Sequence, residues 1–267
     1  MSKFGRFQVA EAPSALKRWH FRTEPTLQPM NWEPLNAVLD QEDLIAQGID
    51  TSQLIPGAAQ VDALGSCTAN ATMSALSHVL STDDYFDHMH CSSYDDAKSI
   101  EEAAILFYHE CTDETGVPAD EWPPNDCGST GPYIVQGLES QGLISGDLIA
   151  SGPDNICSLL QKGGLLVGQP FLNAWMEPDA NGFIDGDGSY ATLQAQLAQG
   201  VAGGHETYLC GLEQIEFHPN GTVDPSKTII RFRNSWGPSW GDHGNYRAHL
   251  STYVALGTYC DFRQLQP

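Results

Sequence analysis

Residues 234–244 read Asn234-Ser-Trp-Gly-Pro-Ser-Trp-Gly-Asp-His-Gly244 and form the most distinctive stretch of this sequence. The stretch directly follows residues 228–233, whose alternating apolar pattern predicts a half-buried strand. Its glycines suit a tight connection between two strands, because glycine adopts backbone conformations that other residues avoid. We therefore expect Asn234 to lie at the end of a strand, with Trp236 close beside it.

A second motif, Leu64-Gly-Ser-Cys-Thr-Ala-Asn70, places a cysteine at the start of a predicted helix. Ser66 is a good N-cap residue, and Met73 and Leu76 begin an apolar helix face. Unsatisfied backbone N–H groups and the helix dipole stabilise negative charge at a helix start. Because the thiolate is the reactive form of cysteine, this position suits Cys67 as a nucleophile.

A third motif, Gly203-Gly-His205, supplies a proton acceptor for that thiol. The two glycines let the His205 side chain reach across a cleft, and a strand is expected to follow. An imidazole base needs a fixed orientation, which the Asn234 amide oxygen can supply. Trp236 would cover that hydrogen bond, and the backbone N–H of Cys67 would face a developing oxyanion.

Together the three motifs resemble the signatures of the papain-like cysteine peptidase family. The order of cysteine, histidine and asparagine is the same, and the similarity covers roughly residues 55–253. It is closest to bacterial and viral members with a Leu-Gly-Ser-Cys-Thr-Ala motif. The resemblance implies Cys67 as nucleophile, His205 as base and Asn234 as the orienting residue. It also implies a peptide or protein substrate and no cofactor.

The resemblance further implies which residues line the substrate cleft. Gly128-Ser-Thr-Gly131 is similar to the glycine-rich wall of the family's cleft, so Gly128, Ser129 and Thr130 are expected there. Gly204 and Trp236, which lie beside the histidine and the asparagine in sequence, complete the expected lining.

The chain departs from the family pattern before the cysteine. Family members usually carry a glutamine six residues upstream, which completes the oxyanion hole, and this chain has Val61 there. Gln60 lies one residue further away, so it is expected to serve only if the intervening loop contains a bulge. Leu64 stands where many secreted members have a half-cystine, so that disulfide is absent.

Helical patterns dominate the first half of the chain and strand patterns the second, which indicates an α+β fold. The resemblance implies a papain-like domain over residues 55–267. Its helical half is expected at about residues 60–150 and its β half at about 151–267, with the active-site cleft between them.

Residues 1–54 are expected to pack on this domain as a permanent N-terminal extension. Trp19, Phe21 and Trp32 are too apolar to leave in water, since each large aromatic side chain can bury about 150–250 Å². Prolines interrupt any long helix in this segment, which argues against a helical inhibitory pro-domain.

Composition limits the partners. The 267 residues carry a net charge of −22, and such a surface repels phosphate backbones and anionic lipid. Nucleic-acid and membrane partners are therefore not expected, while a cationic substrate or a salty environment would suit the charge. No signal peptide and no apolar run of about 18 residues is visible, so we expect an intracellular protein with reduced cysteines.

Alternatives remain for both function and metal binding. A catalytically silent papain-like binding module is favoured by the displaced glutamine, and an amidase or isopeptidase would use the same triad. His88-Met-His-Cys91 and the Asp179–Gly188 loop invite a metal hypothesis, but neither matches a common zinc or EF-hand spacing. No metal is therefore expected, and Glu206 is expected to face solvent on the strand side opposite His205.

Overall fold

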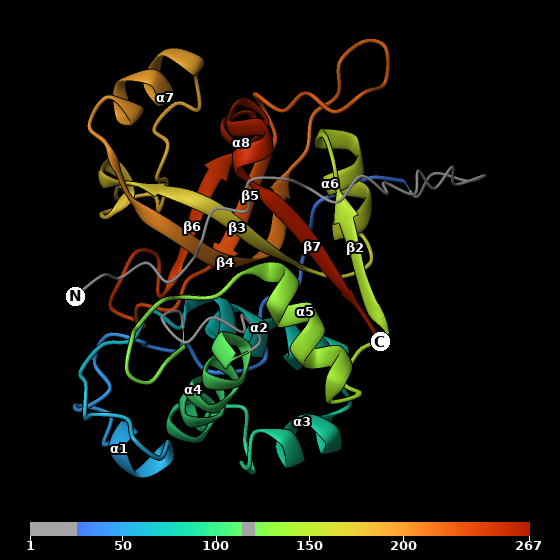
Figure 1. The fold of residues 1–267 in the computed structure, drawn as a ribbon. Coiled ribbons are helices and arrows are strands. Elements are labelled where there is room, and N and C mark those ends of the chain that lie inside the picture. Colours follow the sequence, from blue (N-terminus) through green and yellow to red (C-terminus); the bar gives the residue numbers. More distant parts are fainter. Residues whose placement is uncertain (1–25, 114–120) are drawn as a thin grey trace.

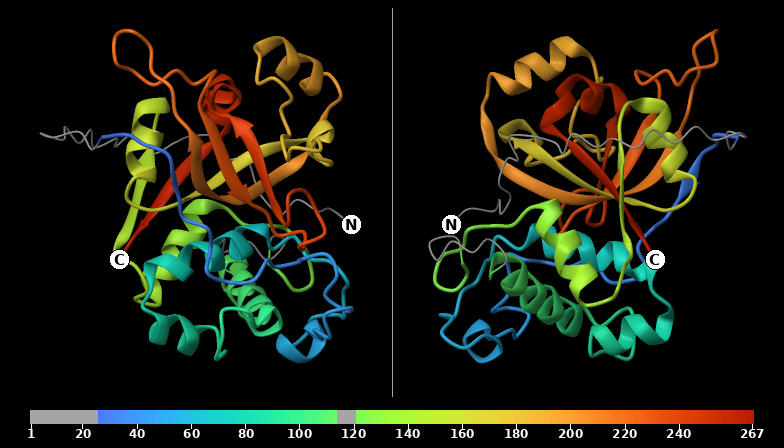
Figure 2. Two further views of the ribbon diagram at one scale, coloured as in Figure 1. Left: turned by 180° about the vertical axis from the view of Figure 1, so that it is seen from behind. Right: turned by 45° about the vertical axis from the view of Figure 1, so that its right-hand side comes forward.

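The computed structural model describes residues 26–113 and 121–267. Helices gather in one half of the described chain, and an antiparallel sheet with its own helices forms the other half (Figure 1). Two further views show the helical half lying against one side of the sheet (Figure 2). The α+β fold predicted from the sequence is confirmed. Trp19 and Phe21 lie outside the described residues.

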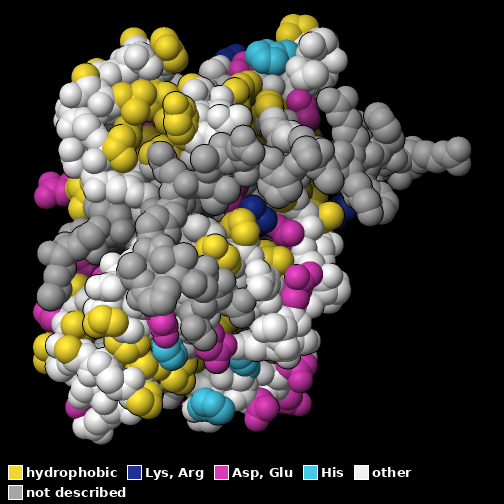
Figure 3. Space-filling view, in the orientation of Figure 1, with side chains coloured by type: hydrophobic (Ala, Val, Ile, Leu, Met, Phe, Trp, Pro, Cys, Tyr) yellow, Lys and Arg dark blue, Asp and Glu magenta, His cyan; other side chains and the backbone are white. Residues whose placement is uncertain are grey.

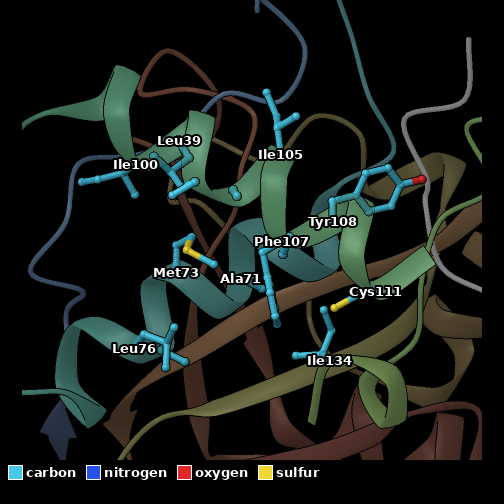
Figure 4. Packing of buried hydrophobic residues seen from close by; sticks show 14 of the residues in the cluster. Leu39, Ala71, Met73, Leu76, Ile100, Ile105, Phe107, Tyr108, Cys111 and Ile134 are labelled. Atoms are coloured by element: carbon cyan, nitrogen blue, oxygen red, sulfur yellow. The ribbon is translucent and has the colours of Figure 1, made fainter. Parts of the chain in front are cut away.

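The helical half is built around one buried helix. Its helices are α1 (Thr51–Leu54), α2 (Cys67–Val79), α3 (Thr82–His88), α4 (Ala97–Asp113) and α5 (Gly131–Ser140). Every residue of α2 from Cys67 to Ser77 is buried. Because many of these side chains are small, neighbouring elements approach α2 closely. Met73 and Leu76 meet Phe107 of α4 and Ile134 of α5 in this core (Figure 4).

The sheet carries the second half. Its strands are β1 (Met30–Asn31), β2 (Gly146–Ala150), β3 (Leu165–Leu172), β4 (Val201–Gln214), β5 (Ile229–Arg233), β6 (Asn245–His249) and β7 (Asp261–Gln266). They lie in the order β2-β7-β3-β4-β5-β6, and every neighbouring pair is antiparallel, with β1 added beside β4. The long strand β4 is central and packs against α2.

Short helices cover the other side of the sheet. They are α6 (Pro153–Leu160), α7 (Tyr190–Leu197) and α8 (Leu250–Leu256), with single turns at Asn173–Trp175 and Gly257–Tyr259. Alternation along β4 divides the two cores: Tyr208 and Cys210 belong to the helical-side cluster, whereas Leu209 belongs to the β-side cluster. A register shift between Leu209 and Gly211 changes the parity beyond it, so Leu212 also belongs to the β-side cluster.

Glu206 does not face solvent, contrary to the expectation from the sequence. The side chain is almost fully buried, with 1% exposed, although a solvent-facing position was expected. Glu206 has the same strand parity as Tyr208, so it lies on the sheet face that the helical half covers. A central strand with both faces covered leaves no solvent side for this residue.

The segment before α2 contacts both halves. The Trp32 indole Nε1 donates to the carbonyl of Leu160 at 2.6 Å, next to the sheet. Leu39 and Leu44 are buried in the helical-side core. The described residues 26–54 therefore pack on the rest of the chain, while the domain boundary placed after residue 54 stays a prediction.

Acidic side chains are spread over the helical half on the face shown in Figure 3, and Lys and Arg are sparse there. None of the helices in the described ranges is both long and apolar enough to cross a membrane. Within residues 26–113 and 121–267, no three His, Cys, Asp or Glu side chains are grouped to hold a metal ion. Each of the seven cysteines is a thiol in the structure.

Candidate active site

Cys67 is the first residue of α2 and is fully buried. The helix starts where the sequence predicted, and Ser66 occupies the N-cap position. The Ser66 hydroxyl makes no capping bond to the backbone, however. The first turn of α2 therefore keeps backbone N–H groups that a side-chain cap would otherwise engage. These groups and the helix dipole favour a negative charge at the Cys67 sulfur.

A buried chain of hydrogen bonds links the start of α2 to α4. The Ser66 hydroxyl donates to Asn70 Oδ1 at 2.8 Å, and Asn70 Nδ2 donates to Glu101 Oε2 at 2.6 Å. Burial raises the pKa of the Glu101 carboxyl to about 7. Sequence analysis missed Glu101, because a glutamate in a predicted helix is usually exposed and only the tertiary packing buries it.

The loop before Cys67 is tied to the glycine-rich segment at Gly128. The Gly65 N–H donates to both carboxylate oxygens of Asp126, at 3.0 and 2.9 Å. The Tyr108 hydroxyl donates to Asp126 Oδ1 at 2.8 Å and accepts from the Gly128 N–H at 2.7 Å. Asp126 and Tyr108 thus join the two segments, and neither residue was expected at the site from the sequence.

His205 and Asn234 are brought together as the sequence predicted. His205 lies on β4 opposite Gln169 of β3, and Asn234 directly follows β5. The hydrogen bond joins His205 Nε2 to Asn234 Oδ1 over 2.7 Å. Asn234 Oδ1 also accepts the Ser235 N–H at 2.8 Å, which fixes the orientation of the amide. Because Oδ1 is the acceptor, Nε2 carries the proton in neutral His205, and Nδ1 is the basic nitrogen.

Aromatic rings enclose this hydrogen bond. Trp236 stacks on the His205 ring with centroids 4.8 Å apart and an interplanar angle of 23°. Phe171 of β3 meets His205 edge-on at 5.1 Å, and Trp240 meets Trp236 edge-on at 5.1 Å. The rings restrict rotation of the imidazole and exclude water from its bond to Asn234. Phe171 and Trp240 were not anticipated from the sequence.

Comparison with solved structures places this arrangement in a known fold. Xylellain, a cysteine protease from Xylella fastidiosa, is similar with a TM-score of 0.56 and 14% identity, over 99% of this chain and 97% of that chain. The chain has a papain-like fold. Procathepsin B S9 from Trypanosoma congolense is similar with a TM-score of 0.50 and 12% identity, over 99% of this chain and 86% of that chain.

Comparison of sequences adds no family assignment. No protein-family model matches the sequence, and no curated protein matches it significantly. Identities of 12–14% establish the papain-like fold alone. The chemistry therefore rests on the residues that this papain-like chain places at its site.

Gln60 is not where the papain-like pattern led us to expect it. The residue is exposed, and its Nε2 donates to the carbonyl oxygens of Ile49 at 3.1 Å and Val61 at 3.0 Å. Its amide is thus engaged by the main chain of residues 49–61. The expectation that Gln60 points toward Cys67 is contradicted, because the loop uses this side chain to close on itself.

The expected cleft residues occupy different environments. Ser129 and Thr130 are buried, and the Ser129 hydroxyl donates to the Cys111 carbonyl of α4 at 3.3 Å. Thr130 is the N-cap residue of α5. Gly128 has a φ of 76°, a conformation that favours glycine. Gly204 is partly exposed and directly precedes His205. Contact of these residues with a substrate stays a prediction.

Proposed function

We propose that this chain is a cysteine peptidase that hydrolyses peptide bonds through a thioester acyl-enzyme. The observation that carries the proposal is the buried 2.7 Å hydrogen bond between His205 and Asn234 beneath Trp236. That bond fixes which imidazole nitrogen is basic. The strand that carries His205 packs against α2, the helix that begins with Cys67.

The proposed reaction begins with proton transfer from the Cys67 thiol to His205 Nδ1. The thiolate then attacks the substrate carbonyl carbon, and the resulting oxyanion accepts a hydrogen bond from the Cys67 backbone N–H. As the C–N bond breaks, imidazolium returns its proton to the leaving amine. Water, deprotonated by His205, then attacks the thioester carbon and releases the carboxylic acid and the thiol.

Asn234 holds the imidazole throughout this cycle. The His205 Nε2–H keeps its bond to Asn234 Oδ1, so the proton that moves is always the one at Nδ1. The Trp236 indole shields this hydrogen bond from water. Water would otherwise compete with His205 for Asn234 Oδ1, and the imidazole ring would then be held less firmly. The proposed cycle uses no metal or organic cofactor, because the thiol, the imidazole and the attacking water take part in every proton transfer and the amide only orients the ring.

Reaction with a thiol-directed epoxide and cleavage of a peptide library test the proposal. Wild-type protein should be labelled at Cys67 and should cleave peptides, and Cys67→Ala should abolish both while the chain stays folded. Cys157→Ala is the matched control, because burial raises the pKa of that thiol to about 12 and keeps it unreactive. Wild-type turnover by Cys67→Ala would refute the mechanism.

The position of Gln60 supports a second candidate, a catalytically silent papain-like binding module. Without that amide, the oxyanion has the Cys67 N–H as its named donor, and losing one such donor costs about 3 kcal/mol of transition-state stabilisation. A silent module would bind peptides but would neither cleave them nor be labelled by the epoxide. An amidase or isopeptidase would be labelled and would cleave only its own class of amide.

A further inference from the structure

Residues 39–44, here called the bridging segment, lie between the two loops that carry the candidate catalytic residues. On one side the Gly237 N–H donates to the Leu39 carbonyl at 3.0 Å. On the same side the Gln41 N–H donates to the Ser235 carbonyl at 3.1 Å. The loop that follows Asn234 is therefore hydrogen-bonded to the bridging segment along its main chain.

The other side of the bridging segment holds the loop that precedes Cys67. The Leu64 N–H donates to the Gln41 carbonyl at 3.0 Å, and the Leu44 N–H donates to the Asp62 carbonyl at 2.9 Å. One segment thus pairs with both loops at once, although residues 62–64 and 235–237 are far apart in sequence.

Gln41 repeats both connections with its side chain. Nε2 donates to the Leu64 carbonyl at 3.0 Å, and Oε1 accepts from the Ser235 hydroxyl at 2.6 Å. The residue is fully buried, so water does not compete for these bonds. Backbone and side chain together give Gln41 two hydrogen bonds to Leu64 and two to Ser235.

Both partners of Gln41 lie close in sequence to a candidate catalytic residue. The Ser235 N–H donates to Asn234 Oδ1, the same oxygen that binds His205 Nε2. Leu64 lies three residues before Cys67, and its neighbour Gly65 is held by Asp126. A shift of Ser235 relative to Leu64 would therefore displace the imidazole relative to the sulfur.

We propose that Gln41 is a positioning residue that sets the relation between the Cys67 loop and the Asn234 loop. The inference rests on the proposed function, since it assigns a role in the same reaction. Gln41 touches neither sulfur nor imidazole and acts through Leu64 and Ser235. Because reacting groups must be held within a fraction of an ångström, loosening this connection slows the chemistry more than substrate binding.

The primary variant is Gln41→Met, which keeps the side-chain length and removes both side-chain hydrogen bonds. We expect kcat to fall about 10- to 100-fold, the scale of a small misplacement, with KM changed by less than about threefold. Alkylation of Cys67 by iodoacetamide should slow at pH 6, and the acid limb of its rate profile should move to higher pH. That shift would report a weaker thiolate–imidazolium pair.

Gln264→Met is the matched control. Gln264 is also a buried glutamine, and its Nε2 donates to the carbonyls of Leu159 and Gly163, both at 2.8 Å. It lies on β7 and bonds to neither catalytic loop. This variant should lose thermal stability while kcat and the alkylation profile match wild type. Equal kinetic losses in the two variants would show that Gln41 is merely structural.

Ser235→Ala provides a milder test if Gln41→Met does not fold, because it removes only the bond to Gln41 Oε1. It should slow Cys67 alkylation about 3- to 10-fold.

Wild-type kinetics in every folded variant would overturn the inference about Gln41 and leave the proposed function standing. An activated wild-type thiol without peptide hydrolysis would refute the proposed function, yet the alkylation profiles would still decide the role of Gln41. An unactivated wild-type thiol would overturn both.

Discussion

Replacing Glu101 with glutamine should remove a pH-dependent loss of stability that this protein carries behind its candidate nucleophile. The Glu101 side chain is fully buried and accepts a 2.6 Å hydrogen bond from Asn70. Burial raises its pKa from 4.5 to about 7, because ionisation would place a charge where water cannot solvate it. Glutamine has nearly the same shape and keeps an acceptor for Asn70, but it cannot ionise.

The direction of the stability change with pH follows from the pKa of Glu101 in the unfolded and the folded state. Between pH 4.5 and 7 the folded state holds the Glu101 proton and the unfolded state has released it. Stability therefore falls as pH rises through this window and is lowest above pH 7. A shift from 4.5 to about 7, at about 1.4 kcal/mol per pH unit, amounts to about 3 kcal/mol of lost stability at pH 8.

Urea denaturation at pH 5 and pH 8 measures this effect. The free energy of unfolding of wild type, relative to Glu101→Gln, should drop by up to about 3 kcal/mol between the two pH values. Peptide hydrolysis by the variant should persist, since the Ser66–Asn70 link is retained. Glu102→Gln is the matched control, because Glu102 is the next residue on α4 but is partly exposed and pairs with Lys98. It should follow wild type at both pH values.

Two results would refute this reasoning. The first is a wild-type stability that stays constant or rises relative to Glu101→Gln from pH 5 to pH 8. The second is a glutamine variant that is destabilised equally at both pH values, which would mean that the carboxyl contributes by shape and bonding rather than by its proton.

Further predictions concern the other half of the site and the N-terminal segment. His205→Ala should lower kcat/KM by about 10³-fold or more, and Asn234→Ala should lower it less, because the amide only orients the ring. Steady-state assays on a cleaved peptide check this order, and an equal or larger loss for Asn234→Ala would contradict it. Deleting residues 1–40 should abolish cooperative unfolding, since Trp32 and Leu39 pack on the body. A stable and markedly faster enzyme would show that the segment is inhibitory.

Local sequence patterns determined much of this fold. The helix beginning at Cys67 and the strand ending before Asn234 were both predicted and confirmed. Each depends on periodicity or capping within about a dozen residues, which a single sequence displays. The short strands β2 and β7 were not predicted, because five or six residues carry too weak a pattern.

The candidate site residues were also proposed from the sequence alone. Three short motifs can be recognised from adjacent residues alone. They are Cys67 at a helix start, His205 after two glycines and Asn234 before Ser-Trp-Gly. The expected hydrogen bond between His205 and Asn234 is present, and Trp236 lies over it. The positions of His205 and Asn234 could be predicted because short sequence motifs mark them, whereas their catalytic roles stay a prediction.

The supporting residues were decided by tertiary structure alone. Gln60 was expected at the site from its sequence position, yet its side chain bonds to its own loop. Gln41, which the sequence did not single out, joins the loop before Cys67 to the loop after Asn234. Glu101 is buried behind Ser66 and Asn70 by packing that no local pattern predicts. Gln41 and Ser235 are 194 residues apart, and their side chains pair only after both halves have packed. A polar residue gains such a role from the partners that folding brings to it, and those partners are set by the whole chain rather than by its neighbours.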